Sequence, residues 1–179
     1  KIDYVRNNDW KMGNGVSVYK AKNFFRDRFI LLMSDHLFDP KILSDLKRCK
    51  LDMDECILCV DRCMKYVFDV KDATKVRVIY DKVVEIGKDL NEYDGVDMGI
   101  FLCSPYIFEV LKESIKKGCY SLTDGIMELA RQEKMKAHCI YDEDRYWIDV
   151  DTLESLKIAE KILLMHDQYY TFDAQKIRV

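Results

Sequence analysis

The sequence predicts an α/β fold with a mainly parallel sheet and an antiparallel hairpin excursion. Continuously apolar runs at residues 29–33, 56–61 and 96–103 are typical of central strands buried on both faces. Segments with helical periodicity alternate with these runs, as in open α/β sheets. Two β-rich stretches, residues 75–80 and 83–87, are separated only by a short turn, which predicts the hairpin.

The remaining elements follow in chain order, and most helices have a recognisable start. Residues 1–5, 135–141 and 146–148 are expected to be extended. Proline is well placed in a first helical turn, and serine and threonine are good N-caps. The helices are expected at residues 13–25, 40–47, 105–117, 121–133 and 152–165, beginning near Gly13, Pro40, Pro105, Ser121 and Thr152.

Composition limits the class of protein. The chain has 179 residues, 49% of them hydrophobic and 34% charged, which suits one compact domain with a substantial core. A net charge of -3 makes nucleic acid a poor partner. No apolar run is long enough to cross a bilayer, and no secretion signal is recognisable.

The cysteines favour a reducing compartment. Seven cysteines form an odd set without a small-domain disulfide pattern, so we expect a cytoplasmic protein. The spacing of Cys56, Cys59 and Cys63 approaches a zinc motif. However, Cys56 and Cys59 lie three apart on an expected strand and should face opposite sides of the sheet. We therefore favour buried structural thiols over a zinc site.

Acidic residues lie in or directly after three of the expected strand segments. Asp35 follows the first run, Asp97 lies in a second, and Asp149 and Asp151 follow the last extended piece. Strand ends meet at the ligand crevice of an open α/β sheet, and Mg²⁺ is usually held by one or two carboxylates together with substrate phosphates. The alternative is that Asp35, Asp149 and Asp151 only cap the helices that follow them.

Several motifs in this order resemble the sugar- and polyol-phosphate nucleotidyltransferase family, which has a GT-A-like Rossmann fold. Within it, the sequence most resembles inositol-1-phosphate cytidylyltransferases. The motifs are Gly13-Asn14-Gly15-Val16-Ser17, Met33-Ser34-Asp35-His36, Asp72-Ala73-Thr74, Ile86-Gly87-Lys88-Asp89-Leu90, Val96-Asp97-Met98-Gly99 and Trp147-Ile148-Asp149-Val150-Asp151-Thr152.

The resemblance implies roles for individual residues. Asp35 and Asp149 would be the catalytic metal carboxylates, with Mg²⁺ as cofactor, and Gly13 and Asn14 would approach the nucleotide. Lys88 would be catalytic in holding the acceptor's phosphate, and Asp97 would bind the acceptor's hydroxyl groups. Asp151 would support the metal site or the helix start. We expect His36 only to pack or to support its neighbours, because transfer to an ionised phosphate needs no strong general base.

The resemblance covers only part of the family's domain. Residues 1–165 would form the C-terminal two-thirds of a nucleotidyltransferase domain, lacking its first βαβ portion and the Gly-rich loop that cradles the triphosphate. Residues 166–179 would be a C-terminal tail. The chain begins with Lys1 rather than Met, which also indicates an incomplete enzyme.

The implied reaction transfers CMP from CTP to inositol 1-phosphate, giving CDP-inositol and pyrophosphate. One alternative is another NTP-dependent nucleotidyltransferase acting on a sugar 1-phosphate or phosphocholine. An alternative of another class is a truncated, non-catalytic binding module. The sequence leaves open the nucleotide, the acceptor, fusion to a membrane domain, and the oligomeric state, for which a homodimer is one option.

Overall fold

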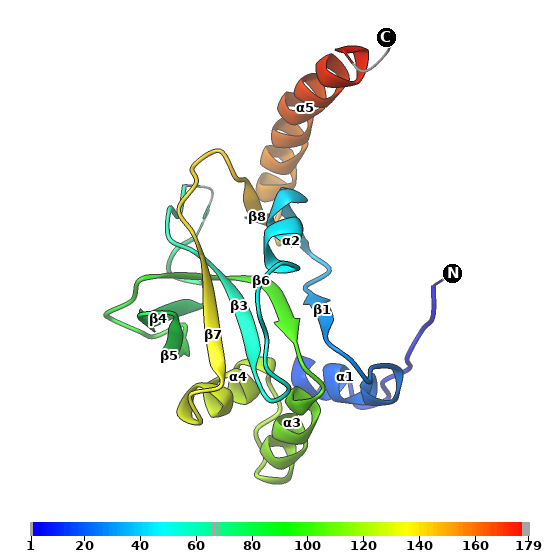
Figure 1. Ribbon diagram of the computed structural model, residues 1–179, viewed down its shortest axis with the longest axis vertical. Coiled ribbons are helices and arrows are strands. Elements are labelled where there is room, and N and C mark those ends of the chain that lie inside the picture. The colour runs from blue at the N-terminus through cyan, green and yellow to red at the C-terminus, as the bar shows by residue number, and fades with distance from the viewer. Residues whose placement is uncertain (1, 66, 68, 177–179) are drawn as a thin grey trace.

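The described residues form a six-stranded sheet with helices on both faces (Figure 1). The computed structural model describes the backbone of residues 2–65, 67 and 69–176, and side chains as far as Met165. The strands lie in the order β1 (Phe29–Leu32), β6 (Gly95–Cys103), β3 (Cys56–Asp61), β7 (Met135–Ile140), β5 (Lys82–Gly87) and β4 (Lys75–Ile79). A separate two-stranded sheet pairs β2 (His36–Phe38) with β8 (Trp147–Asp149).

The sheet is mixed rather than mainly parallel, which corrects the prediction. Among the described strands, only β3 and β7 pair in parallel. Strands β1, β3, β4 and β7 share one direction, but β6 runs against it and lies between β1 and β3. Two helices, α3 (Tyr106–Lys116) and α4 (Leu122–Arg131), connect β6 to β7. One crossover helix returns the chain parallel, whereas two return it antiparallel. The predicted hairpin of β4 and β5 is confirmed.

The core has one layer on each face of the sheet. All six residues of β3 are buried, and they alternate between the layers. Leu58 and Val60 pack toward α3 and α4, while Ile57 packs toward α2 (Lys41–Leu46) and Trp147. The α/β class and the predicted central strands at residues 56–61 and 96–103 are therefore confirmed. The prediction was wrong for residues 29–33, because β1 lies at the edge of the sheet and is only partly buried.

The helices begin where their caps predicted. At the start of α4, Ser121 Oγ accepts a hydrogen bond from the Asp124 backbone, and the Asp124 carboxylate accepts one from the Ser121 backbone, a complete capping box. At the start of α5 (Leu153–Lys176), Thr152 and Ser155 exchange the equivalent hydrogen bonds, so a serine hydroxyl replaces the usual acid. The first helix, α1 (Asn14–Lys20), is shorter than predicted and is followed by a 3₁₀ turn, Lys22–Phe24.

Both ends of the chain differ from the predictions. Residues 2–5 are not a strand, because none of the described strands pairs with them, and Ile2 and Tyr4 are 77% and 87% exposed. Helix α5 runs across the predicted boundary at residue 165, while residues 177–179 lie outside the described chain. None of the described helices is both long enough and apolar enough to span a membrane.

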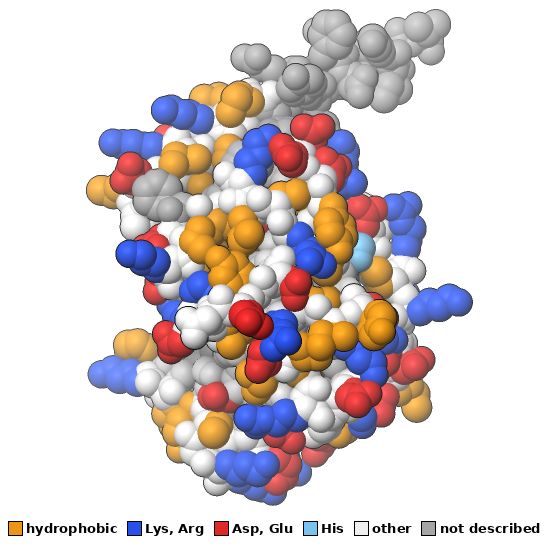
Figure 2. Space-filling model, turned by 90° about the vertical axis from the view of Figure 1, so that its left-hand side faces the viewer, with side chains coloured by type: hydrophobic (Ala, Val, Ile, Leu, Met, Phe, Trp, Pro, Cys, Tyr) orange, Lys and Arg blue, Asp and Glu red, His pale blue; other side chains and the backbone are white. Residues whose placement is uncertain are grey.

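Charges of both signs are mixed over the molecular face in Figure 2, where basic and acidic side chains lie next to one another. Exposed ion pairs on the described surface include Lys82 with Glu133 and Lys116 with Glu113. Such pairs contribute little to stability because water and salt screen them. The mixed charges therefore favour solubility without creating a strong electrostatic field of one sign on this face.

The cysteine positions support buried thiols over zinc. Cys56 and Cys59 lie in the cores on opposite faces of the sheet, as predicted from their spacing. Burial raises the pKa of the Cys59 thiol, which disfavours the thiolate that zinc requires. We predict that elemental analysis of protein purified without added zinc will find no stoichiometric zinc. One zinc per chain that disappears in a Cys59→Ser variant would contradict this assignment.

Candidate active site

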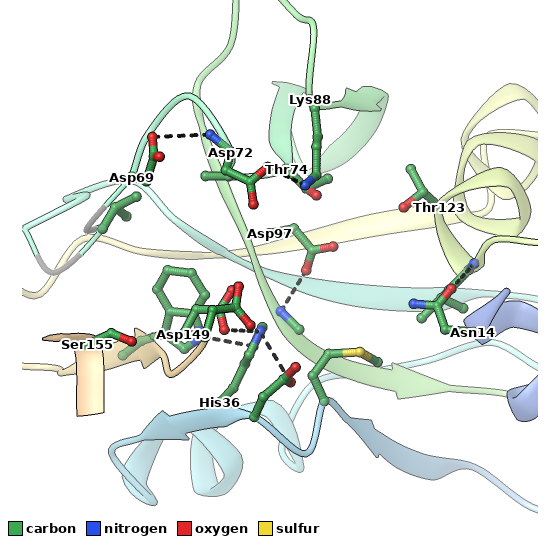
Figure 3. A pocket seen from close by; sticks show the side chains of 18 of the residues that line it. Asn14, His36, Asp69, Asp72, Thr74, Lys88, Asp97, Thr123, Asp149 and Ser155 are labelled. Carbon is green, nitrogen blue, oxygen red and sulfur yellow. Dashed lines mark hydrogen bonds and ion pairs between the residues drawn. The ribbon is translucent and has the colours of Figure 1, made fainter. Parts of the chain in front are cut away.

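A cavity of about 440 Å³ brings together residues from distant parts of the chain. Five of the six predicted site residues line it: Asn14, Asp35, Lys88, Asp97 and Asp149. Figure 3 shows His36 and Asp149 on one side, Lys88 and Asp72 on the opposite side, and Asp97 between them. A cavity of this size is in the range of small-molecule sites. The fold therefore places the predicted metal and acceptor residues around one space.

The two predicted metal carboxylates meet through the small sheet. Strands β2 and β8 pair in a register that places His36 opposite Asp149, and the Val150 backbone donates to the Asp35 carbonyl oxygen. Ligand atoms of Asp35, His36 and Asp149 lie within 4.8 Å of one another. An antiparallel pair thus joins a residue near the start of the chain to one near its end.

Asp149 has an oxygen suited to a cation. Its Oδ1 atom is buried and accepts no hydrogen bond from any described residue. Burial is the main cause that raises the pKa of Asp149, and the nearby carboxylates of Asp151 and Asp35 raise it further, while His36 opposes them. A bound divalent cation would satisfy this oxygen and reverse the electrostatic cost of neighbouring carboxylates. The donor set of Asp35 and Asp149 therefore fits Mg²⁺, which prefers oxygen ligands.

The His36 ring is held firmly beside these carboxylates. Its Nδ1 atom lies 2.7 Å from the Met98 carbonyl oxygen, which also accepts a hydrogen bond from Trp147 Nε1 at 2.7 Å. The Trp147 ring contacts the imidazole edge-on, with 5.4 Å between ring centroids. Trp147 is therefore a buried anchor for this ring, and the packing predicted for His36 fits the contacts made.

The structure argues against simple helix capping by the two acids. Asp35 is followed by strand β2 rather than a helix, and Asp39 accepts a hydrogen bond from the Lys41 backbone at the start of α2. At α5 the cap is Thr152. Asp35 and Asp149 are thus left facing the cavity.

Asp97 lies in the middle of the cavity wall. Its Oδ1 accepts a hydrogen bond from the Gly99 backbone at 2.7 Å. Burial raises its pKa to about 6, while the Gly99 hydrogen bond and the His36 charge act in the opposite direction. A carboxyl group with such a pKa exchanges between accepting and donating forms near neutral pH. It can therefore hydrogen-bond the hydroxyl groups of a polyol.

Lys88 forms an ion pair with another residue on its own side of the cavity. Its Nζ lies 2.6 Å from Asp72 Oδ1, and both side chains are more than half exposed. Asp72 itself stands in a turn organised by Asp69, whose carboxylate accepts hydrogen bonds from the Lys71 and Asp72 backbone. The sequence motif Asp72-Ala73-Thr74 marked this segment, but its role as the partner of Lys88 was missed. Residues distant in sequence become partners here only through the fold.

The two residues predicted to approach the nucleotide, Gly13 and Asn14, lie in different positions relative to the cavity. Asn14 lines the cavity, and its Oδ1 accepts a hydrogen bond from the Leu122 backbone in the first turn of α4. Gly13 is not among the lining residues, so its predicted contact with the nucleotide is not supported by this placement. A Cβ on Gly13 would lie 2.6 Å from the Tyr120 carbonyl oxygen. Gly13 therefore allows α1 to approach α4, which positions Asn14.

No family model matches the sequence. Two relatives, each named "Bifunctional IPC transferase and DIPP synthase", are similar over most of the chain. The protein from Rubrobacter xylanophilus is 37% identical over 164 residues, which cover 91% of this chain and 36% of the relative. The protein from Archaeoglobus fulgidus is 36% identical over 160 residues, covering 89% of this chain and 30% of the relative. The chain thus spans about a third of the length of these relatives.

Solved structures share the fold. An inositol-1-phosphate CTP transferase from T. maritima superposes with a TM-score of 0.75 at 24% identity, covering 87% of this chain and 63% of that one. A putative glucose-1-phosphate thymidylyltransferase from Bacillus anthracis has a TM-score of 0.64 at 17% identity, covering 90% of this chain and 62% of that one. The chain therefore has the α/β fold of these nucleotidyltransferase structures, with a GT-A-like mixed sheet.

Proposed function

We propose that this chain belongs to an enzyme that transfers CMP from CTP to inositol 1-phosphate, giving CDP-inositol and pyrophosphate. The observation that carries the proposal is the meeting of Asp35 and Asp149 at one end of a cavity whose other end holds Lys88. The names of the sequence relatives and of the T. maritima structure favour inositol phosphate and CTP over other substrates.

Each of the cavity residues would have a separate role in such a transfer. Asp35 and Asp149 would hold Mg²⁺, which stabilises the negative charge that develops on the reacting phosphates. Lys88 would hold the acceptor's phosphate, and Asp97 would accept hydrogen bonds from the polyol. Asn14 would orient the nucleotide. The acceptor phosphate oxygen is already ionised, so positioning and charge stabilisation carry the reaction without a strong general base.

The proposed reaction is tested by pyrophosphate release from the full-length protein. Four nucleoside triphosphates are each combined with inositol 1-phosphate, glucose 1-phosphate and phosphocholine, with and without Mg²⁺. We expect the highest kcat/KM for CTP with inositol 1-phosphate. A preference for glucose 1-phosphate would instead support the sugar-phosphate alternative suggested by the B. anthracis fold relative. No release with any pair would support the non-catalytic binding module.

Lys88 is predicted to be specific for the acceptor. Its exposed ion pair with Asp72 contributes at most about 1 kcal/mol, so a phosphate can compete for the ammonium group. A charge-assisted hydrogen bond to phosphate contributes on the order of 1.5–3 kcal/mol, so Lys88→Ala should raise the inositol 1-phosphate Kd about 10- to 150-fold. Lys88→Arg should restore only part of this affinity, because the planar guanidinium group of Arg does not place its charge where the compact ammonium group of Lys does.

A matched surface lysine controls for loss of charge alone. Lys116 has a similar exposure and an ion pair of 2.7 Å with Glu113, but it lies on α3 away from the cavity. Calorimetric titrations of CTP and of inositol 1-phosphate are compared for wild type, Lys88→Ala and Lys116→Ala. Equal weakening of both ligands in Lys88→Ala, or of neither, would remove Lys88 from the acceptor site.

The cytoplasmic location and a homodimeric state are further proposals. The first rests on unpaired cysteines, several of them buried, which suit a reducing compartment.

A further inference from the structure

The hydrogen bonds of His36 determine which ring nitrogen faces the carboxylates. The Met98 carbonyl oxygen can only accept, so His36 Nδ1, 2.7 Å away, must carry the hydrogen. Trp147 Nε1 also lies 3.3 Å from this nitrogen, but its shorter contact of 2.7 Å is to the same carbonyl. Both N–H groups therefore share the Met98 oxygen. In the neutral ring this leaves the lone pair on Nε2.

The lone pair of His36 Nε2 is directed at the two carboxylates. Nε2 lies 3.8 Å from Asp35 Oδ1 and 3.7 Å from Asp149 Oδ1. Both distances are too long for hydrogen bonds. Ligand atoms that bind one ion at about 2.1 Å lie about 3 Å apart when adjacent and about 4 Å apart when opposite. The two separations fall between these values, and all three ligand atoms lie within 4.8 Å of one another, so small side-chain movements would bring them around one cation.

The backbone keeps the ring in this place. Gly99 interrupts the side-chain pattern of β6 with a φ of 66°, and a Cβ there would lie 2.3 Å from His36 Nδ1. The imidazole thus occupies the space that a side chain at position 99 would fill. Only 11% of the His36 side chain is exposed, so the ring has little freedom to turn away. A ligand fixed in this manner binds a metal without further loss of conformational entropy.

We propose that His36 Nε2 is the third protein ligand of the cation, and that it makes the site bind Mn²⁺ more tightly than Mg²⁺. This inference rests on the metal site of the proposed function and adds a nitrogen donor to its two carboxylates. Imidazole suits first-row transition metals, whereas carboxylate and water suit Mg²⁺. Mg²⁺ can still serve in the reaction, because three oxygen or water positions remain for substrate phosphates and solvent.

The test measures metal binding to substrate-free, full-length protein. Mn²⁺ and Mg²⁺ are titrated separately, with free Mn²⁺ followed by electron paramagnetic resonance and heat followed by calorimetry. The informative variant is His36→Asn, since an Asn amide can still donate to the Met98 carbonyl but offers nothing at the Nε2 position. Loss of groups that only orient a ligand weakens metal binding about 10- to 100-fold, so loss of a ligand itself should weaken Mn²⁺ binding at least roughly tenfold.

Mg²⁺ affinity should change much less in His36→Asn, so the ratio of Mn²⁺ to Mg²⁺ affinity should fall. His36→Gln, which can place an amide oxygen near the Nε2 position, should recover Mg²⁺ binding better than Mn²⁺ binding. His138→Asn is the control, because His138 lies on β7 and its Nδ1 faces Cys49 Sγ rather than the carboxylates. Circular dichroism checks that each variant is folded.

The outcomes separate this inference from the proposed function. Tight Mn²⁺ binding that is unchanged in both folded His36 variants would overturn the ligand role and leave the carboxylate site intact. Absence of any Mn²⁺ binding by the wild type, with pyrophosphate release still observed, would also overturn it. Metal binding of the expected kind without CTP turnover would support the ligand role and count against the proposed reaction instead.

Discussion

Replacing Asp149 with Asn should reduce metal-dependent turnover by at least about 10³-fold, because metal stabilisation of transition-state charge contributes several kcal/mol. Asn keeps the shape of the side chain but removes the charge that attracts the cation. The buried Oδ1 atom of Asp149 accepts no hydrogen bond from the described residues to compensate for its desolvation, so its main favourable interaction would come from the ion. The same substitution at Asp35 should have a similar effect. Steady-state pyrophosphate release over a range of Mg²⁺ concentrations measures both.

Without metal, Asp149→Asn should not destabilise the protein, although it should lower turnover. Burial and neighbouring carboxylates raise the pKa of Asp149, so its native-state pKa exceeds the unfolded value. The charged form is therefore disfavoured in the folded protein, and this unfavourable contribution grows as pH rises through the two pKa values. Thermal melts in EDTA at neutral pH should find the Asn variant at least as stable as wild type, while added divalent metal should stabilise only wild type.

Asp151 provides a nearby control. It lines the same cavity and contributes to the raised pKa of Asp149, but it is not one of the three clustered ligand residues. Asp151→Asn should therefore lower turnover far less than Asp149→Asn. Near-wild-type kcat in Asp149→Asn at ordinary Mg²⁺, or equal losses in both variants, would show that Asp149 is not a specific metal ligand.

The sequence predicted strands more reliably than their pairing. A strand buried on both faces requires apolar residues at every position, so the run Cys56–Asp61 revealed β3 with its full length. The direction of pairing depends instead on what connects the strands. Both helices that follow β6 were predicted, but the apolar residues of β6 do not show that it lies between β1 and β3 and runs against both. The predicted parallel majority failed for that reason.

Site residues could be predicted where they follow an apolar run at a strand end. Their interaction partners in other segments of the chain could not be predicted. Asp35 and Asp149 were found because acids following apolar runs are expected at the crevice. The pairing of Lys88 with Asp72 depends on the register of the β4–β5 hairpin, which places Lys75 opposite Gly87 and was not predicted from the sequence. His36 was predicted to have only a supporting role, because it was considered as a general base and the reaction needs none. Its orientation toward both carboxylates becomes visible only when Met98 and Trp147 are placed beside it.

Gly99→Ala should disturb both the fold and the metal site. The left-handed conformation at φ 66° costs a residue with a Cβ about 1–2 kcal/mol. The new methyl group would also lie 2.3 Å from His36 Nδ1 and 2.7 Å from Met33 Cγ. Met33 is flexible enough to move, whereas the His36 ring is confined between β6 and Trp147. Chemical denaturation should therefore show a loss of more than about 2 kcal/mol, combining backbone strain with overpacking.

Gly87→Ala is the stability control. Gly87 ends β5 without a left-handed φ, and a Cβ there would meet no atom within 4 Å. Alanine at such a position should leave stability unchanged or raise it slightly, because it restricts the unfolded chain. A loss in Gly87→Ala as large as that in Gly99→Ala would mean that general glycine replacement, rather than the contact with His36, is being measured.

A double variant separates the contact from the backbone strain. In His36→Ala the ring that the new methyl group would strike is gone, so adding Gly99→Ala to it should cost only the strain of the left-handed backbone. The loss of stability in the double variant should therefore be smaller than the sum of the two single losses, since neighbours in direct contact are not additive. Metal binding should stay weak in all three variants, because each either displaces or removes the ring. Strict additivity in stability, or wild-type Mn²⁺ affinity in Gly99→Ala, would show that position 99 does not hold His36 in place.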